Sequence, residues 1–121
     1  MSDIDYSELS NNLDSVVVLD VRNRDEVEKF GQIPGSHSLP LGEMEDALQM
    51  DDDDFQDKYG FPKPTSDQKL VTSCMKGGRA RKAAETLASS GIEARVYPGS
   101  FVDWKAQGGE VVDGKPHHLH H

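Results

Sequence analysis

Short runs of β-branched and apolar residues alternate with helical patterns along most of the chain. The pattern predicts strands, each bounded by polar residues, glycine or proline, over residues 15–21, 36–39, 69–73 and 93–97. Apolar residues at helical spacing predict helices between and after them, over residues 24–31, 41–50, 79–91 and 100–109. This alternation favours an α/β fold with a parallel or mostly parallel sheet and helices on both faces.

Two of the helical segments have distinctive compositions. The helix from Arg79 is expected to end with Gly91 just beyond its last turn and to bury a stripe formed by Ala80, Ala83, Ala84, Leu87 and Ala88. The acidic run 51–54 predicts the start of another helix, since aspartate is favoured near a positive helix N-terminus, with Phe55 and Tyr59 facing inward. Prolines 62 and 64 then favour an extended connection.

The length and composition fit a single domain. Of the 121 residues, 35% are hydrophobic and 29% are charged, so the chain can bury a core but is too polar for a membrane protein. We expect one domain over residues 1–112 and a flexible tail over residues 113–121, which contains the histidine cluster PHHLHH. The acidic opening MSDIDYSEL lacks an apolar targeting region, and we therefore expect a cytoplasmic location.

The net charge narrows the possible partners. A formal charge of −9 argues against a nucleic-acid binder, which needs a basic surface. We also expect no membrane partner, because no apolar run is long enough to span a bilayer. An anionic substrate must therefore be held by local positive charge. We expect no metal and no cofactor, and we interpret the terminal histidines as part of the tail. The single cysteine excludes an internal disulfide.

That cysteine, Cys74, lies between the third predicted strand and a helix, in the stretch KLVTSCMKGGRARKAAETL. A free thiol is only about 3% thiolate at neutral pH, so an effective nucleophile needs help. Glycines can turn backbone N–H groups toward an anion, and the next helix offers its positive end. A lone cysteine is usually a small buried apolar residue. Here, however, a nucleophile is favoured by the neighbouring Lys76, Gly77, Gly78, Arg79 and Arg81.

The stretch CMKGGRA resembles the active-site loop of rhodanese-like sulfurtransferases, in which a cysteine and an arginine five positions later bound a six-residue loop. Cys74 and Arg79 have this spacing. LDVRNRDEVEKFGQIPGSHSLPL is similar to the family's first strand, its Asp-x-Arg pair, its glutamate and its Ile-Pro-Gly turn, and YPGSFVDWKAQG to its closing pattern. The resemblance covers about residues 5–109. Gln32 and Pro98 depart from it, since many members have histidine and glycine there, and local turn geometry is in question at both.

The resemblance implies a five-stranded, mainly parallel sheet and a ping-pong transfer of sulfane sulfur. The Cys74 thiolate would attack the outer sulfur of thiosulfate or a related small anionic donor and would carry a persulfide. Lys76 and Arg79 would attract the donor. With no second cysteine, the acceptor must be external, such as glutathione, thioredoxin or, in vitro, cyanide. The anion-binding loop implied in this way consists of Met75, Lys76, Gly77, Gly78 and Arg79.

Three polar residues are candidates for supporting roles. Asp20 and Arg22 follow the first strand at the same sheet edge as Cys74, so a hydrogen bond between Asp20 and the loop is expected. For Arg22, an ion pair with Glu26 is favoured over contact with substrate. By contrast, we interpret Phe101 and Trp104 as core residues and His37 as structural.

Two other functions stay open. A cysteine-dependent phosphatase or arsenate reductase uses the same fold, but its loop carries one more residue between cysteine and arginine, which widens the cradle for phosphate. A non-catalytic module for protein binding or sulfur sensing typically lacks the cysteine. The acidic run 51–54 could dock a basic partner, although such runs are usually just solvated.

Overall fold

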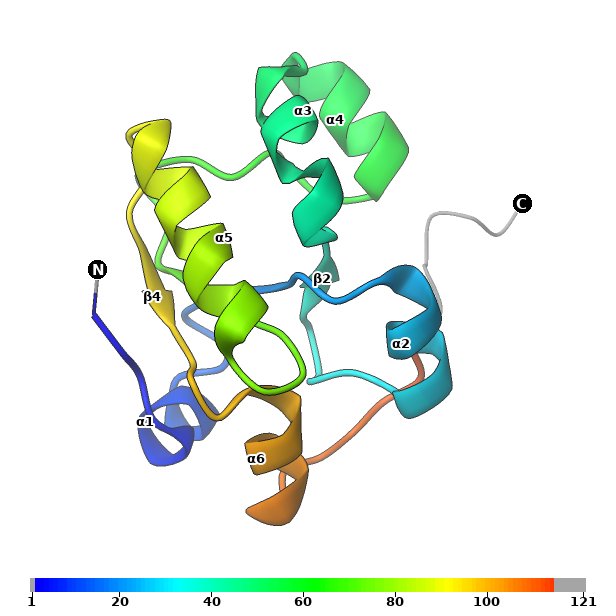
Figure 1. Ribbon diagram of the computed structural model, residues 1–121, viewed down its shortest axis with the longest axis vertical. Helices are drawn as coiled ribbons and strands as arrows, with labels where there is room; N and C mark the ends of the chain where they lie inside the picture. The colour runs from blue at the N-terminus through cyan, green and yellow to red at the C-terminus, as the bar shows by residue number, and fades with distance from the viewer. Residues whose placement is uncertain (1, 115–121) are drawn as a thin grey trace.

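A four-stranded parallel sheet forms the centre of the computed structural model, which describes residues 2–114 (Figure 1). The strands lie in the order β2-β1-β3-β4, and every neighbouring pair is parallel. Their bounds are β1 (Val17–Asp20), β2 (His37–Ser38), β3 (Leu70–Ser73) and β4 (Ala94–Val96). The helices are α1 (Tyr6–Asn11), α2 (Arg24–Phe30), the 3-10 turn η1 (Leu41–Glu43), α3 (Met44–Gln49), α4 (Asp52–Tyr59), α5 (Gly78–Ser89) and α6 (Ser100–Ala106).

The expectation of five strands is wrong for the described residues. A segment from the N-terminus does lie alongside β4, where Ile4 N–H donates to the Val96 carbonyl at 2.8 Å and Val96 N–H donates to Ser2. The pairing reduces to one bridge between Asp3 and Val96. It ends there because the Asp5 side chain accepts the Glu8 N–H and so starts helix α1.

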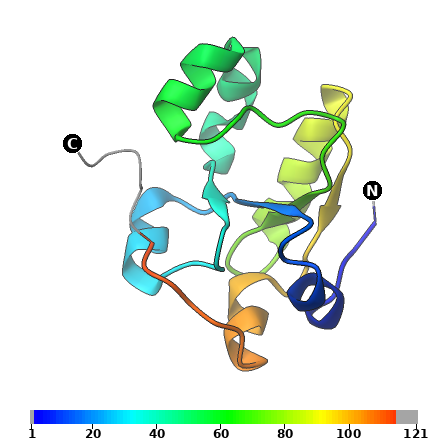
Figure 2. The ribbon, with the colours of Figure 1, turned by 180° about the vertical axis from the view of Figure 1, so that it is seen from behind.

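Helices cover both faces of the sheet, as expected, because alternate strand residues point to opposite sides. Leu19 and Leu70 belong to one apolar cluster, which includes residues of α3, α4 and α5. Val18 and Val71 belong to the other cluster, with residues of α1 and α6. Figure 1 shows α5 in front of the sheet, and the view from behind in Figure 2 brings α1 to the front.

The central helix α5 confirms most of its predicted stripe. Ala80, Ala83, Ala84 and Leu87 are buried, and Gly91 has a positive φ of 78° just beyond the helix end. Ala88 is exposed, so that part of the prediction is wrong. At about 100° per residue, Ala88 is rotated roughly 80° from Ala80 and lies at the margin of the buried face.

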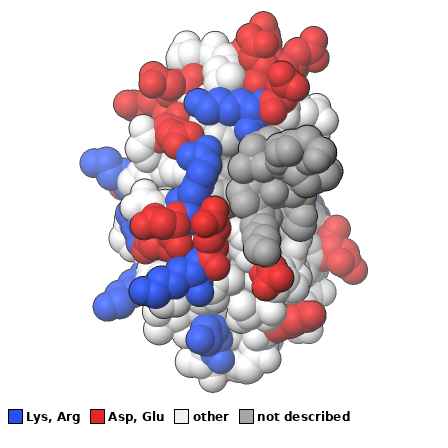
Figure 3. Space-filling view, turned by 90° about the vertical axis from the view of Figure 1, so that its right-hand side faces the viewer, with Lys and Arg blue, Asp and Glu red and all other residues white. Residues whose placement is uncertain are grey.

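The acidic run 51–54 starts a helix, as expected. Asp51 caps α4 by accepting the Asp54 N–H at 2.9 Å, and Phe55 and Tyr59 are both buried. Figure 3 shows acidic side chains gathered at the top of the molecule, the end where α3 and α4 lie. Charge at this end is therefore explained in part by helix initiation.

Several loops meet at the carboxyl edge of the sheet. Asp20 and Ser73 are register partners at the ends of β1 and β3, so the segments that follow them lie side by side. The residues that follow β4 join them, because Tyr97 N–H donates to the Thr72 carbonyl. In such folds ligands bind at this edge. Within residues 2–114, no helix has the length and apolar character needed to cross a membrane.

Both positions that depart from the family pattern are ordered by local contacts. Gln32 is buried, and its side-chain amide donates to the Ser36 carbonyl at 2.7 Å and hydroxyl at 3.0 Å. Its backbone pairs in both directions with Val112. Pro98 packs its carbonyl against Gly77, so it helps to define the turn geometry there. Residues 115–121 lie outside the described part of the chain, and the flexible tail stays a prediction.

Candidate active site

Cys74 follows β3 immediately, at the edge of the sheet where the loops gather, and its side chain is buried. Thr72 anchors the end of the strand, since its hydroxyl donates to the Ala80 carbonyl at 2.7 Å and so ties β3 to α5. The loop 74–79 therefore has fixed ends. Because the loop backbone is fixed at both ends, the fold also limits where the Cys74 sulfur can lie.

Backbone N–H groups converge on the Cys74 sulfur. The Gly77 N–H donates to Sγ at 2.9 Å and the Ala80 N–H at 3.3 Å. Ala80 lies in the first turn of the twelve-residue helix α5, so the sulfur sits at the positive end of that helix. These donors form a small anion-binding cradle, which stabilises a negatively charged sulfur more than a neutral one.

Helix α6 holds the other side of the loop. Phe101 N–H donates to the Cys74 carbonyl at 3.0 Å, and Val102 N–H donates to the Met75 carbonyl at 3.1 Å. With these carbonyls turned toward α6, the loop peptides are fixed in orientation. This explains why a helix of seven residues, remote in sequence, matters to the cysteine loop.

Ser100 is a site residue that sequence analysis missed. Its Oγ accepts the Cys74 N–H at 3.0 Å and lies 2.8 Å from the Tyr97 carbonyl and 3.8 Å from Sγ. Ser100 is buried and has a φ of 56°, in the left-handed region that non-glycine residues rarely adopt. Its distance of 26 positions from Cys74 hid it; only the adjacent ends of β3 and β4 bring the two together.

The surroundings of the thiol act on its pKa in opposite directions. Burial raises the pKa of Cys74, but hydrogen bonds from the Ala80 and Gly77 amides, with smaller contributions from Ser100 and Lys76, outweigh burial and hold the pKa below its usual value. The net result favours the thiolate. A thiolate is the nucleophilic form of cysteine, so this geometry suits attack on an electrophilic atom.

Gly77 has a conformation that its position requires. Its φ is 111°, and an ideal Cβ placed there would overlap the carbonyl oxygen of Pro98. Gly78, by contrast, has an ordinary φ and open space around the corresponding point. The two glycines expected to shape the loop therefore have different roles, and only Gly77 is sterically required.

Arg79 forms a two-pronged ion pair with Glu26, with nitrogen-to-oxygen distances of 2.6 and 3.0 Å. This pair joins the cysteine loop to α2. The hydrogen bonds from Arg79 lower the pKa of Glu26 from 4.5 to about 2, although burial opposes the shift. The expected pairing of Arg22 with Glu26 is wrong, because Glu26 faces the loop arginine instead.

Arg22 is instead fully buried with Asp20. Its Nη2 lies 2.6 Å from Asp20 Oδ2 and also donates to the Gly31 carbonyl at 2.8 Å. The guanidinium also lies over the Phe101 ring, 4.3 Å from its centroid. The expected hydrogen bond between Asp20 and the cysteine loop is therefore not observed among the described contacts, in which Asp20 accepts from Arg22. This carboxylate neutralises Arg22 inside the domain.

The remaining candidates differ in exposure. Lys76 is exposed at the loop tip, whereas Met75 is half-buried and packs against the apolar cluster that contains Trp104. Phe101 and Trp104 are buried, as expected of core residues. His37 stacks on Phe61 with ring centroids 4.3 Å apart, which agrees with a structural role. Residues 2–114 contain no cluster of three or more histidine, cysteine, aspartate or glutamate side chains suited to a metal ion.

A second polar network, which sequence analysis also missed, links α2, η1 and α4. The Arg24 guanidinium binds the Glu43 carboxylate, and Tyr59 donates its hydroxyl to Glu43 at 2.9 Å. Burial and this hydrogen bond raise the pKa of Tyr59 to about 12, so its hydroxyl stays protonated. The network holds the segments after β1 and β2 against α4.

Comparison with known proteins identifies the family of this chain. The model of the rhodanese-like domain family matches residues 5–107, and the chain belongs to this family. It is 41% identical over 104 residues to "Thiosulfate sulfurtransferase/rhodanese-like domain-containing protein 3" of Mus musculus, covering 84% of this chain and 66% of that protein. It is 39% identical over 89 residues to human "Thiosulfate:glutathione sulfurtransferase", covering 72% and 76%.

Among solved structures, the human single-domain sulfurtransferase TSTD1 aligns with a TM-score of 0.84 and 33% identity, covering 90% of this chain and 99% of that one. The chain spans only about two thirds of the mouse relative's length. Two yeast relatives are named as mitochondrial proteins, so the cytoplasmic location expected from the sequence stays a prediction.

Proposed function

We propose that this protein transfers sulfane sulfur from thiosulfate to an external thiol through a persulfide on Cys74. The observation that carries the proposal is the pair of N–H groups aimed at Sγ, one from Gly77 in the six-residue loop and one from Ala80, the first residue after it. Names of relatives that refer to thiosulfate and to glutathione support both substrates. Thioredoxin and cyanide are further candidate acceptors with the same chemistry.

In the first half-reaction the Cys74 thiolate attacks the outer sulfur of thiosulfate. A bond forms between Sγ and that sulfur, the sulfur–sulfur bond of thiosulfate breaks, and sulfite leaves with the electron pair. The amides around Sγ stabilise the thiolate before attack and the anionic persulfide after it. Lys76, exposed at the loop tip, attracts the dianionic donor against the negative charge of the whole chain.

In the second half-reaction an acceptor thiolate attacks the outer sulfur of the persulfide. The new bond joins the acceptor to that sulfur, the bond to Sγ breaks, and the electron pair returns to the Cys74 thiolate. No other cysteine is present in the chain to resolve the persulfide. The acceptor therefore has to come from solution.

We assign Arg79 mainly a positioning role. Both of its terminal nitrogens bind Glu26, so the guanidinium is already engaged beside the loop. It still adds positive charge near the sulfur. In a phosphatase of this fold, the loop carries one more residue between cysteine and arginine. The shorter loop of this chain favours sulfur transfer over phosphoryl transfer.

Steady-state kinetics test the proposal. The protein is supplied with thiosulfate and, in separate assays, glutathione, thioredoxin or cyanide, and sulfite release is followed. We expect turnover that depends on the acceptor and disappears in Cys74→Ser. Hydrolysis of an aryl phosphate without sulfite release from thiosulfate would contradict the proposal and favour the phosphatase.

A further inference from the structure

A pocket of about 350 Å³ lies beside the cysteine loop. Residues of the loop and of α5 line the pocket together with Pro98. They are Lys76, Gly77, Gly78, Arg81, Lys82 and Glu85. We refer to these residues as the cationic pocket. Its volume lies at the lower end of the range for sites that bind small molecules. The mechanism described above uses Lys76 and the Gly77 N–H but gives no role to Arg81, Lys82 or Glu85.

The charge of the cationic pocket is opposite to that of the chain. It contains three cationic side chains and one carboxylate, whereas the whole protein carries a formal charge of −9. Arg81 also pairs with Asp3 at 3.2 Å, but these side chains are 46% and 53% exposed. Exposed ion pairs of this kind are weak, so a carboxylate of a ligand can replace Asp3 or share the guanidinium with it.

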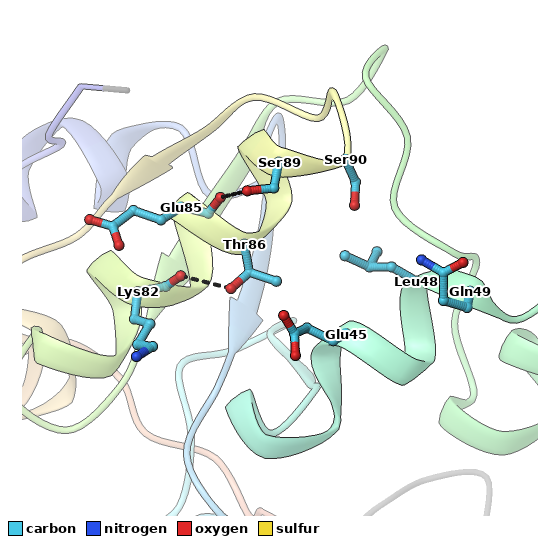
Figure 4. Close-up of a pocket in the computed structure, with 8 residues that line it drawn as sticks. All are labelled: Glu45, Leu48, Gln49, Lys82, Glu85, Thr86, Ser89 and Ser90. Atoms are coloured by element: carbon cyan, nitrogen blue, oxygen red, sulfur yellow. Dashed lines mark hydrogen bonds between the residues drawn. The ribbon is translucent and has the colours of Figure 1, made fainter.

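Neighbouring cavities have the wrong charge for an anion. Lys82 and Glu85 also line a cavity between α5 and α3, where Glu45 faces Thr86 across the gap and gives a net negative charge (Figure 4). On the other side of Pro98, the next cavity is lined by four carboxylates, from Asp3, Asp5, Glu8 and Asp103. Among the described cavities beside the loop, the cationic pocket is therefore the one suited to an anionic group.

The cationic pocket is close to the reacting sulfur. Gly77 belongs to both sites, since its N–H donates to Cys74 Sγ at 2.9 Å while its backbone lines the pocket. The space beside Gly78 is open, with no atom within 4 Å of the point where a Cβ would stand. Because Gly77 is common to both, a thiol at the persulfide and a carboxylate in the pocket would lie at neighbouring parts of the same loop.

We propose that the cationic pocket binds a carboxylate of the acceptor thiol and so selects small anionic thiols, of the type of glutathione, over neutral ones. This inference rests on the proposed function and assigns Arg81 and Lys82 to acceptor binding. The bound acceptor then carries out the second half-reaction as written above, with its thiol proton released to solvent before attack.

The test compares two acceptors, glutathione and neutral 2-mercaptoethanol, with thiosulfate as donor. The measured quantity is the ratio of kcat/KM for glutathione to kcat/KM for 2-mercaptoethanol. We expect Arg81→Gln and Lys82→Gln to lower this ratio about threefold each, and the double variant about tenfold, as befits partly exposed charge pairs. Glu85→Gln removes the one carboxylate of the pocket and is expected to raise the ratio about twofold.

Lys69→Gln is the matched control, because it makes the same change of charge at an exposed position before β3, at the opposite end of that strand from the loop. Its ratio is expected to stay that of the unaltered protein. Equal losses for both acceptors, or an unchanged ratio in the double variant, would overturn the inference while leaving sulfur transfer intact. If the unaltered protein forms no persulfide from thiosulfate, the proposed function fails and the inference fails with it.

Discussion

Replacing Gly77 by alanine should damage the cradle around the cysteine. The backbone at this position has a φ of 111°, and a methyl group there would overlap the carbonyl oxygen of Pro98. A positive φ costs an L-residue about 1–2 kcal/mol, and displacement of the Pro98 backbone adds to this. We expect Gly77→Ala to lower the free energy of unfolding by about 2–4 kcal/mol, a large share of the typical 5–15 kcal/mol of a domain.

The same substitution should weaken the thiolate. The Gly77 N–H donates to Sγ at 2.9 Å, and a shift of the loop lengthens this hydrogen bond. A hydrogen bond to a charged group contributes about 1.5–3 kcal/mol, and 1.36 kcal/mol corresponds to one pKa unit. We therefore expect the pKa of Cys74 to rise and the rate of persulfide formation at neutral pH to fall.

Two assays check both effects. Urea unfolding gives the stability, and the pH dependence of alkylation by iodoacetamide gives the thiol pKa, without ambiguity because the chain has one cysteine. Gly78→Ala is the matched control, since its Cβ meets open space and alanine favours helix by up to about 1 kcal/mol. A thiol pKa that responds equally to both substitutions would refute the reasoning.

Three further predictions concern residues around the loop. Glu26→Gln breaks the ion pair with Arg79 and should cost about 1–2 kcal/mol in urea unfolding at pH 7, a figure that allows for solvent screening. Folding lowers the pKa of Glu26 from 4.5 to about 2, so its contribution to stability is present above pH 4.5 and is lost as the pH falls toward 2. The free energies of unfolding of the two proteins should therefore converge near pH 2. A difference that stays constant with pH would argue against the ion pair. Asp20→Asn leaves the buried Arg22 charge uncompensated and should cost about 3–5 kcal/mol in the same assay, and a loss under about 1 kcal/mol would mean that the charge is neutralised otherwise. Ser100→Ala removes the hydroxyl that lies 3.8 Å from Sγ and helps to lower the thiol pKa, so this pKa should rise in the alkylation assay; an unchanged pKa would limit Ser100 to packing.

Local patterns predicted the elements because each one satisfies a local rule. Valine-rich runs form the central strands, and the alanine stripe of α5 is buried. In both cases the spacing of apolar residues along the chain determines which element forms and which face it buries. Helix α1 was missed because its six residues bury only Leu9 and so carry little periodic signal. The prediction of a fifth strand was wrong because the start of this helix ends the pairing with β4 after Asp3.

The site was predictable where it depends on neighbouring residues in the chain. Strand, cysteine, glycines and helix follow one another, so the cradle at Cys74 could be expected from their order. The ion pairs could not be predicted from the sequence, since charges that are close in sequence compete with charges brought close by folding. Glu26 pairs with Arg79 from 53 positions away rather than with Arg22. Ser100 is hidden for the same reason, because only the sheet brings it to the sulfur.

The central claim is that Cys74 carries the transferred sulfur. Intact mass measurement after incubation with thiosulfate, and again after addition of glutathione, tests it most directly. The account predicts a gain of one sulfur atom that is absent in Cys74→Ser and is removed by glutathione. A protein whose mass does not change with thiosulfate, or whose gain persists in Cys74→Ser, would contradict it.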